Sequence, residues 1–385
     1  EPVAYPVTKQ KDSSLYKGET EVVKAGKKGS KTVVREKTWV DGKLTTTIGV
    51  DYGRSSDARH GFENFVGPAF GLKGALRRDE TDVVSNVDPY IQAEWERGPL
   101  VLTAGVRHTK LEVEVDDHFA SNGNDSGAID YSNTTPLLGA LYKVSPVFNV
   151  YGSAARSFEA PTLNELFYSS GGAGFNFKLK PAKGTHGEIG VKAIVGSNTR
   201  INAALFEVRT DDELVVDTSA GGRTSYRNAS KTSRRGAELS LDTSFGAGFG
   251  ARLALTALRA TYESPFGSVR AGSRLPGVPA ANMFGELAWK DKAGRFGAAL
   301  EAIASSKVYA EDANTEIPAP GYAIANARVN ARQAAHGWTI KEFVRVNNLF
   351  DRAYVGSLIV GDTNKRYYEA AQGRNWMAGA SAEYT

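Results

Sequence analysis

Apolar and polar residues alternate without a break through residues 375–385, at the end of the chain. Successive side chains of a β-strand point to opposite faces, so one face would carry Trp376, three alanines and Tyr384. A strand of a transmembrane β-barrel has this pattern, because it turns apolar residues to lipid, aromatic residues to the interfaces and a polar face to the lumen. A half-buried strand of a soluble sandwich alternates in the same way. The rest of the chain has to decide between the two.

The same alternation recurs from residue 44 onward. It predicts strands at 44–53, 87–96, 100–113, 132–143, 147–158, 185–195, 199–209, 234–243, 251–262, 280–290, 295–305, 321–332, 338–347 and 375–385. Long connections at 54–86, 114–131, 159–184, 210–233, 263–279, 306–320 and 348–374 alternate with short ones near 97–99, 145–146, 196–198, 247–248, 291–294 and 334–337. An up-and-down barrel gives such alternation, with short turns at one rim and longer loops at the other. A soluble sandwich gives no reason for it.

Composition agrees with a barrel and excludes a helical membrane protein. Hydrophobic residues make up 41% of the chain, yet no apolar run approaches the ~20 residues that a transmembrane helix needs. The mean hydropathy of −0.34 leaves a barrel possible, since half of each barrel strand is polar. The chain has 41 glycines, 17 Phe, 16 Tyr and only 14 prolines, which favours strands and turns. The expected fold is an all-β, antiparallel, up-and-down transmembrane β-barrel portion.

Several classes of chemistry lack their residues. With 0 cysteines the chain has no disulfide framework and no thiolate site, and 47 basic against 43 acidic residues give no sign of a nucleic-acid partner. The histidines form no H-E-x-x-H pattern, and no serine stands in a G-x-S-x-G elbow. The acidic segment 116–125 lacks the twelve-position spacing of a calcium loop. We therefore expect no enzyme, no metal site and no cofactor.

Residues 1–43 differ from the rest by their many lysines. The segment 31–40 reads as a strand, but both of its faces carry charges, and a charge near the bilayer midplane costs roughly 2–4 kcal/mol. A small soluble hairpin module therefore suits it better than a lipid-facing strand.

Four short stretches in this region resemble part of a G5 domain, a small β module of bacterial surface proteins. They are Tyr16–Gly18, Val22-Val23, Gly26–Gly29 and Val40–Lys43. The resemblance implies polysaccharide binding, with a hairpin-rich linker as the alternative. The expected domains are thus a G5-like module or foreign linker over 1–43 and a barrel over 44–385.

Four stretches in the barrel region resemble a known family. They are Arg156–Phe167, Leu179–Lys192, Asn228–Leu239, and Val346–Val355 with the closing strand. Together they look like the barrel of a TonB-dependent outer-membrane receptor of Gram-negative bacteria, over about 44–385. The resemblance implies a 22-stranded barrel with an N-terminal plug, which takes up siderophores, other metal chelates or scarce cofactors with energy from the TonB complex.

The chain departs from this family pattern in two ways. No plug, TonB box or first strands of the barrel are recognisable, and the chain stops at Thr385 without the family's usual terminal aromatic residue. We expect about the last 14 strands behind a foreign-looking head, whether as a fragment, a chimera or a misassembled frame. A passive outer-membrane channel and a surface carbohydrate-binding protein acting through 1–43 are the alternative functions.

The resemblance places ligand contacts on long loops that are dense in aromatic residues and arginine. The candidates are Phe167, Tyr168, Phe175, Phe177, Arg223, Tyr226, Arg227, Arg366, Tyr367 and Tyr368. An anionic chelate would need arginine forks and stacking surfaces. The alternative for each is a girdle aromatic or a loop-packing residue.

The motifs also predict local structure. Pro161 should end a strand, because it has no N–H to donate. Thr162 and Glu165 have the spacing of a capping box for one helical turn. The segment 347–351 should be a strand end followed by a turn.

Overall fold

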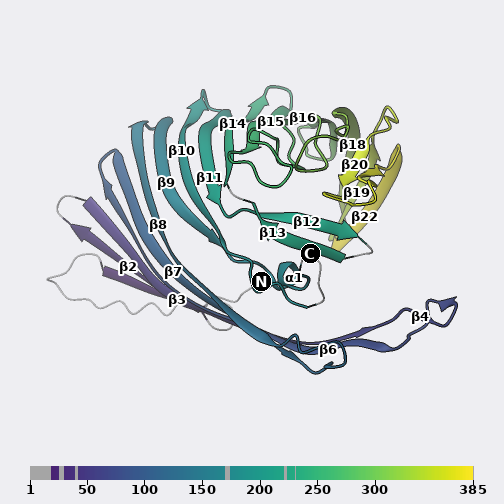
Figure 1. Ribbon diagram of the computed structural model, residues 1–385. Coiled ribbons are helices and arrows are strands. Elements are labelled where there is room, and N and C mark those ends of the chain that lie inside the picture. The colour runs from purple at the N-terminus through teal and green to yellow at the C-terminus, as the bar shows by residue number, and fades with distance from the viewer. Residues whose placement is uncertain are drawn as a thin grey trace.

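A computed structural model describes residues 19–25, 30–39, 42–169, 174–220, 223–229 and 231–384. One antiparallel sheet of sixteen strands dominates it and curves into a partial barrel (Figure 1). In spatial order its strands are β1 (Glu19–Ala25), β2 (Ser30–Trp39), β3 (Gly42–Phe62), β6 (Leu76–Arg97), β7 (Leu100–Asp117), β8 (Gly127–Ser145), β9 (Phe148–Glu159), β10 (Ala182–Val195), β11 (Thr199–Asp211), β14 (Lys231–Phe245), β15 (Phe249–Tyr262), β16 (Ala281–Lys290), β17 (Phe296–Ser305), β18 (Tyr322–Ala335), β19 (Trp338–Asn347) and β22 (Asn375–Tyr384).

The order of the strands in the main sheet is their order along the chain, so each strand pairs with the main-sheet strands before and after it in the sequence. This is the up-and-down topology that the loop lengths predict. Two-stranded ribbons project from three of the long connections. They pair β4 (Phe65–Val66) with β5 (Ala69–Phe70), β12 (Leu214–Ala220) with β13 (Arg223–Asn228), and β20 (Val355–Leu358) with β21 (Tyr368–Ala370). The predicted all-β antiparallel architecture is confirmed. Among the described residues, no helix is long and apolar enough to cross a membrane.

All fourteen predicted strands are present, and several of them extend further into the long connections than predicted. β3 and β6 remain paired as far as Phe62 and Leu76, inside the segment predicted as a loop. Figure 1 shows this hairpin extending well beyond the neighbouring strands. Polar residues occupy both of its faces there, as at Ser55, Ser56 and Asp57. Beyond the apolar band no face has to be hydrophobic, so the alternation that marks a strand disappears while its hydrogen bonds continue.

The first described strands belong to the same sheet. β1 pairs with β2, and β2 pairs with β3 from Ser30↔Asp51 to Trp39↔Gly42. The hairpin of residues 19–39 therefore continues the barrel wall. The G5-like assignment of 1–43 stays a prediction, and residues 1–18, 26–29 and 40–41, which carry part of that resemblance, lie outside the described residues.

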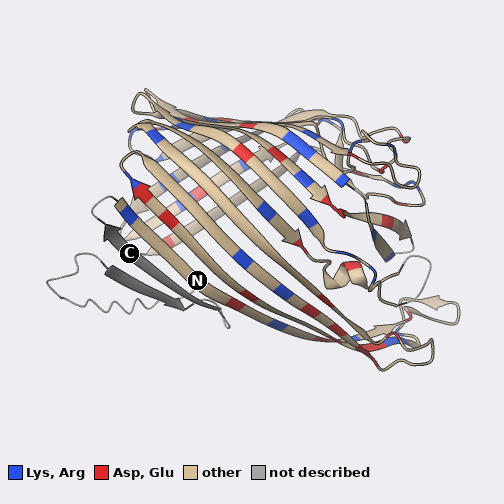
Figure 2. Cartoon of the chain, turned by 60° about the vertical axis from the view of Figure 1, so that its left-hand side comes forward, with Lys and Arg blue, Asp and Glu red and all other residues tan. Residues whose placement is uncertain are grey.

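The two faces of the sheet differ as the alternation predicts. On the convex face Ile189 and Leu205, which are cross-strand partners, are 62% and 57% exposed. Aromatic residues gather on this face at the short-turn rim: Phe148, Phe245, Phe249, Trp289, Trp338 and Tyr384. Figure 2 shows long uncharged stretches of strand between separated charged positions. An apolar band bordered by an aromatic girdle is the surface that a barrel presents to lipid.

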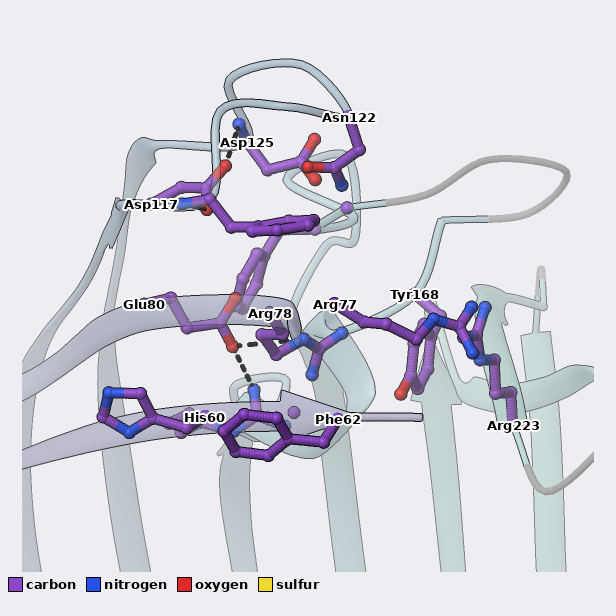
Figure 3. A pocket seen from close by; sticks show the side chains of 15 residues that line it. His60, Phe62, Arg77, Arg78, Glu80, Asp117, Asn122, Asp125, Tyr168 and Arg223 are labelled. Atoms are coloured by element: carbon purple, nitrogen blue, oxygen red, sulfur yellow. Dashed lines mark hydrogen bonds and ion pairs between the residues drawn. The ribbon is translucent and has the colours of Figure 1, made fainter. Parts of the chain in front are cut away.

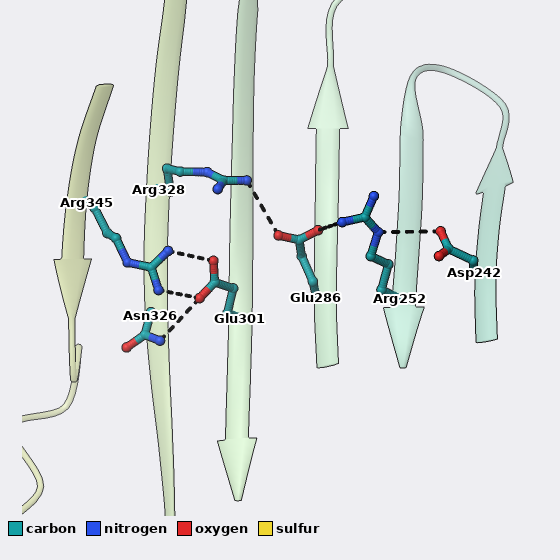
Figure 4. A network of polar contacts seen from close by, with 7 residues as sticks. All are labelled: Asp242, Arg252, Glu286, Glu301, Asn326, Arg328 and Arg345. Atoms are coloured by element: carbon teal, nitrogen blue, oxygen red, sulfur yellow. Dashed lines mark hydrogen bonds and ion pairs between the residues drawn. The ribbon is translucent and has the colours of Figure 1, made fainter. Parts of the chain in front are cut away.

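The concave face carries a network of charges that neutralise one another (Figure 4). Glu286 and Glu301 stand directly opposite each other on β16 and β17. Arg345 forms a bidentate pair with Glu301, at 2.7 and 2.5 Å, and Arg328 lies 3.5 Å from Glu286. Arg252 connects Glu286 at 3.9 Å to Asp242 at 3.4 Å. Three guanidinium groups thus offset three carboxylates.

Loops fill the concave side near the long-loop rim. Helix α1 (Leu163–Leu166) and the β12–β13 ribbon lie there against the sheet (Figure 1). Leu166 packs with Val113 and Leu179 in one buried cluster, and Tyr262, Val269 and Leu275 belong to a second. The core of the chain therefore lies between the inner wall of the sheet and its loops.

The local predictions from the motifs are also confirmed. β9 ends at Glu159, ahead of Pro161, and α1 begins with a complete capping box of Thr162 and Glu165. After β19 ends at Asn347, Asn348 has a positive φ of 52°, and the Asp351 amide donates to its carbonyl at 2.9 Å.

The Glu301–Arg345 pair provides a test of the inner wall. Glu301 is only 6% exposed, so Arg345→Met should leave a buried carboxylate unpaired and lower the free energy of unfolding by about 3–5 kcal/mol. Adding Glu301→Gln should recover part of the loss, because it removes that charge. Urea-induced unfolding in detergent micelles measures both. Lys341→Met, which breaks a pair whose side chains are 55% and 64% exposed, should cost under about 1 kcal/mol. Equal losses for the two single variants would contradict this account.

Candidate functional site

A cavity of about 470 Å³ opens among the loops at the long-loop rim (Figure 3). Its lining comes from the extended ends of β3 and β6, the connection after β7, the segment after α1, and β13. These elements lie far apart in the sequence. The curvature of the sheet and the inward folding of the loops bring them together.

An ion-paired arginine forms the base of the cavity. The Arg59 guanidinium donates to Glu80 at 2.6 Å and lies 3.4 Å from Asp82, and Arg78 approaches Glu80 at 3.6 Å. Glu80 and Asp82 are 5% and 1% exposed. Arg59 also lies 3.4 Å above the ring centre of Phe167, a cation–π contact. These contacts hold the base in one arrangement.

Aromatic rings form one wall. Phe175 meets Phe167 edge to face at 5.6 Å and stacks on Phe177 at 5.7 Å. Tyr168 lies between two cations, with the Arg78 guanidinium 5.3 Å and the Arg223 guanidinium 5.4 Å from its ring centre. Figure 3 shows the side chains of Arg77 and Arg223 close to the Tyr168 ring.

Two of the four arginines lining the cavity remain available to a ligand. Arg77 and Arg223 are exposed, and within the described part of the chain neither guanidinium has a carboxylate partner. By contrast, the Asp117 carboxylate already accepts the amides of Phe119 and Asp125, at 2.9 and 3.0 Å. Free guanidinium forks beside aromatic faces suit an anionic ligand that has flat or conjugated groups.

Six of the ten residues predicted from sequence lie in or beside this cavity, Phe167 among them through its contacts with Arg59 and Phe175. Tyr168, Phe175 and Arg223 line the cavity. Phe177 supports Phe175 from behind, and Tyr226 packs against the cluster around Leu166. Their role as ligand contacts stays a prediction.

The arginines of β3 and β6 were missed. Arg59, Arg77 and Arg78 lie in the segment 54–86, which the sequence predicts as a loop and which is poor in the aromatic clusters used to choose the candidates. The adjacent pair Arg77 and Arg78, which precedes the predicted strand 87–96, is the one sequence feature that could have indicated these arginines as ligand contacts. The partnership of Arg59 with Glu80 depends on a cross-strand register that the loop interpretation could not supply.

The other predicted residues lie elsewhere and hold loops to one another. Arg227 lies 3.4 Å from Asp217 and 3.8 Å from Asp312. Tyr367 is only 8% exposed, the Tyr368 hydroxyl donates to the Ile317 carbonyl, and the Arg366 amide donates to Asp362. None of the four lines the cavity.

Asp312 is the buried centre of these loop contacts. Its carboxylate accepts a hydrogen bond from the Tyr262 hydroxyl at 2.7 Å. Burial raises the pKa of Asp312 above its ordinary value of 3.8, and the Tyr262 hydrogen bond and the Arg227 charge only partly oppose this.

The raised pKa of Asp312 predicts a pH-dependent contribution to stability. The folded state holds this proton more tightly than the unfolded state, so the contribution is fully present below about pH 3.8 and is lost as pH rises through the folded-state pKa. Asp312→Asn keeps an oxygen for Tyr262 but cannot ionise. The melting temperature of the variant minus that of the parent should therefore increase over this window. Asp116→Asn, which removes an exposed carboxylate near the end of β7, is the control, and an equal increase there would contradict the assignment.

Comparison with known proteins finds a matching family and several solved structures of similar fold. The family model described as "TonB dependent receptor-like, beta-barrel" matches residues 9–349. The ferric citrate transporter FecA in its unliganded form superposes with a TM-score of 0.76 at 17% identity, over 95% of this chain and 57% of that one. The siderophore receptor PiuA from Acinetobacter baumannii gives 0.71 at 18% identity, over 94% and 56%. The copper transporter OprC gives 0.70 at 15% identity, over 95% and 57%. This chain thus spans little more than half the length of each.

Proposed function

This chain belongs to the family of TonB-dependent receptor β-barrels, and from that premise we propose that it forms the ligand-binding barrel portion of an uptake receptor. The receptor would lie in the outer membrane of a Gram-negative bacterium, in contact with its lipid, and would take up a metal chelate such as a ferric siderophore. The TonB complex would supply the energy through a plug. Catalysis is no part of this proposal.

The observation that carries the proposal is the arginine-rich, aromatic-walled cavity at the long-loop rim. Ferric siderophores and related chelates are often anionic and carry flat carboxylate or aromatic groups. Guanidinium forks bind such oxygens in pairs, and aromatic rings stack on the flat groups. The names of the similar structures, a ferric citrate transporter, a siderophore receptor and a copper transporter, support the same class of cargo.

The arginines of the cavity would have two different roles in binding. Arg59 is engaged by Glu80 and Asp82 and supports Phe167 from below. Arg77 and Arg223, which lie close to Tyr168, would meet the anionic groups of the ligand (Figure 3). Because the base is already neutralised, the two free guanidinium groups provide most of the attraction.

The test is binding of ferric citrate, an anionic probe, measured by tyrosine and tryptophan fluorescence of the chain in detergent micelles. The double variant Arg77→Gln/Arg223→Gln should bind about tenfold or more weakly, since two charge-assisted contacts are lost. Binding of an uncharged iron hydroxamate complex should weaken little in this variant. Lys292→Gln/Arg332→Gln, which removes two charges near the short turns, is the matched control. A passive channel, the alternative, would show no saturable binding and no difference between the variants.

A further inference from the structure

One edge of the β3–β6 hairpin has no neighbouring strand beyond the barrel wall. β2 accompanies β3 only as far as the pair Ser30↔Asp51, whereas β3 continues to Phe62. On the opposite side of the hairpin, β7 accompanies β6 up to the pair Glu80↔Asp117. Figure 1 shows the hairpin continuing well beyond β2. Within the described residues, the outer edge of β3 is therefore unpaired beyond Asp51.

The hydrogen bonds of the hairpin show which backbone groups lie on this edge. The Asp79 carbonyl accepts the His118 amide at 2.8 Å, so the backbone groups of Asp79 point to β7. Successive residues of a strand direct these groups to opposite sides, so those of Glu80 point to β3, and those of its direct partner Arg59 point to β6. The even-numbered residues of β3 therefore direct their N–H and C=O groups away from β6. Five exposed residues of this kind lie beyond Asp51, namely Tyr52, Arg54, Ser56, Ala58 and His60.

This edge, residues 52–60, is called the free edge of β3 below, and it lacks the features that usually protect an exposed strand. Proteins place lysine, proline, a bulge or a covering loop at such an edge, because a row of unpaired N–H and C=O groups can pair with another chain. The free edge contains no lysine and no proline, and its register with β6 stays regular until Gly61. No backbone hydrogen bond from another described segment reaches it. Its length is sufficient for a full strand.

The side chains along the free edge favour an acidic partner. Arg54 is exposed and has no ion-pair partner in the part of the chain that the structure describes. Asp57, the one acidic residue of the free edge, belongs to the opposite face of the strand and accepts a hydrogen bond from the Ser55 hydroxyl at 3.3 Å. Opposite charges on directly paired strands attract each other, and aromatic residues pair well with β-branched ones. Tyr52, which is 48% exposed, offers such an aromatic surface on the same face as Arg54.

We propose that the free edge of β3 binds an extended acidic segment of a second protein by β-strand addition. The segment would pair its backbone with the five residues that point away from β6, and would place a carboxylate beside Arg54. Backbone hydrogen bonds supply the affinity in this mode of recognition, and side chains supply the specificity. The partner would lie on the long-loop side of the membrane, because the free edge begins where the exposed apolar residues Ile48 and Val50 end. The inference goes beyond chelate uptake and uses no contact of the cavity.

The test uses a dye-labelled peptide of nine residues in which threonine and glutamate alternate. Threonine favours strands, and glutamate supplies the carboxylates. Fluorescence anisotropy measures its binding to the whole chain in neutral detergent micelles at low salt, and saturable binding is expected. The same peptide with N-methyl groups on two adjacent central residues lacks a donor on each of its edges, so it should bind about tenfold or more weakly. A peptide with lysine in place of glutamate should also bind more weakly, because its charges would face Arg54.

The double variant Ser56→Pro/Ala58→Pro tests the same contact from the protein side. It removes two N–H groups that point away from β6, and proline is tolerated where the N–H of an edge strand faces solvent, so β3 and β6 should remain paired. Binding of the acidic peptide should weaken by about tenfold or more. The matched control, Ser56→Val/Ala58→Val, keeps both donors and should bind the peptide as the parent does. Far-ultraviolet circular dichroism shows whether the variants keep their strands.

The proposal would be overturned by the absence of saturable binding of the acidic peptide, by equal binding of its N-methylated or lysine form, or by equal binding in the proline and valine variants. Analytical ultracentrifugation of the parent adds one more outcome. A dimer that the proline variant no longer forms would show that a second copy of the chain covers the free edge, which would also overturn the proposal. A failure of ferric citrate binding alone would count against the uptake function and leave this inference standing.

Discussion

Backbone hydrogen bonding between neighbouring strands is the constraint on which the rest of this structure depends. Lipid offers no partner to an N–H or C=O group, so a spanning strand must be paired along its length on both sides. Every strand of the main sheet between its two edge strands, β1 and β22, has two neighbours in that sheet. Once the strands are paired, side chains can only alternate between the two faces. The apolar convex face and the charged concave face are both consequences of that geometry.

Register then decides which charges meet. Glu286 and Glu301 repel each other as direct partners, and the structure tolerates them because Arg328 and Arg345 reach across from β18 and β19. The inner wall is therefore a balanced network whose members depend on one another. On the outer face of β15 the residues from Phe249 to Ala257 carry no charge, and Arg259 is the first charged residue. The same pattern of backbone hydrogen bonds therefore determines where the charged residues of the inner and outer faces lie.

The cavity uses the same ladder beyond the membrane. β3 and β6 stay paired after their apolar stretch ends, and this rigid hairpin holds Arg59, Glu80 and Asp82 in contact. The loops that carry Phe175 and Arg223 then fold onto it from other parts of the barrel. A site built in this way has an ion-paired base and two unpaired arginines, Arg77 and Arg223, as the proposed binding of an anionic chelate requires.

Residue order alone was enough to locate the fourteen barrel strands, the alternation of short and long connections, and the apolar face of each strand, because a two-residue period is a local property. It also indicated Tyr168, Phe175 and Arg223, since aromatic and arginine-rich loops are visible in the sequence. Only the tertiary structure revealed the paired extension of β3 and β6, the partners of Arg59, and the separation of Arg227 and Tyr367 from the cavity. These depend on cross-strand register and on contacts between segments far apart in the chain, which no local pattern records.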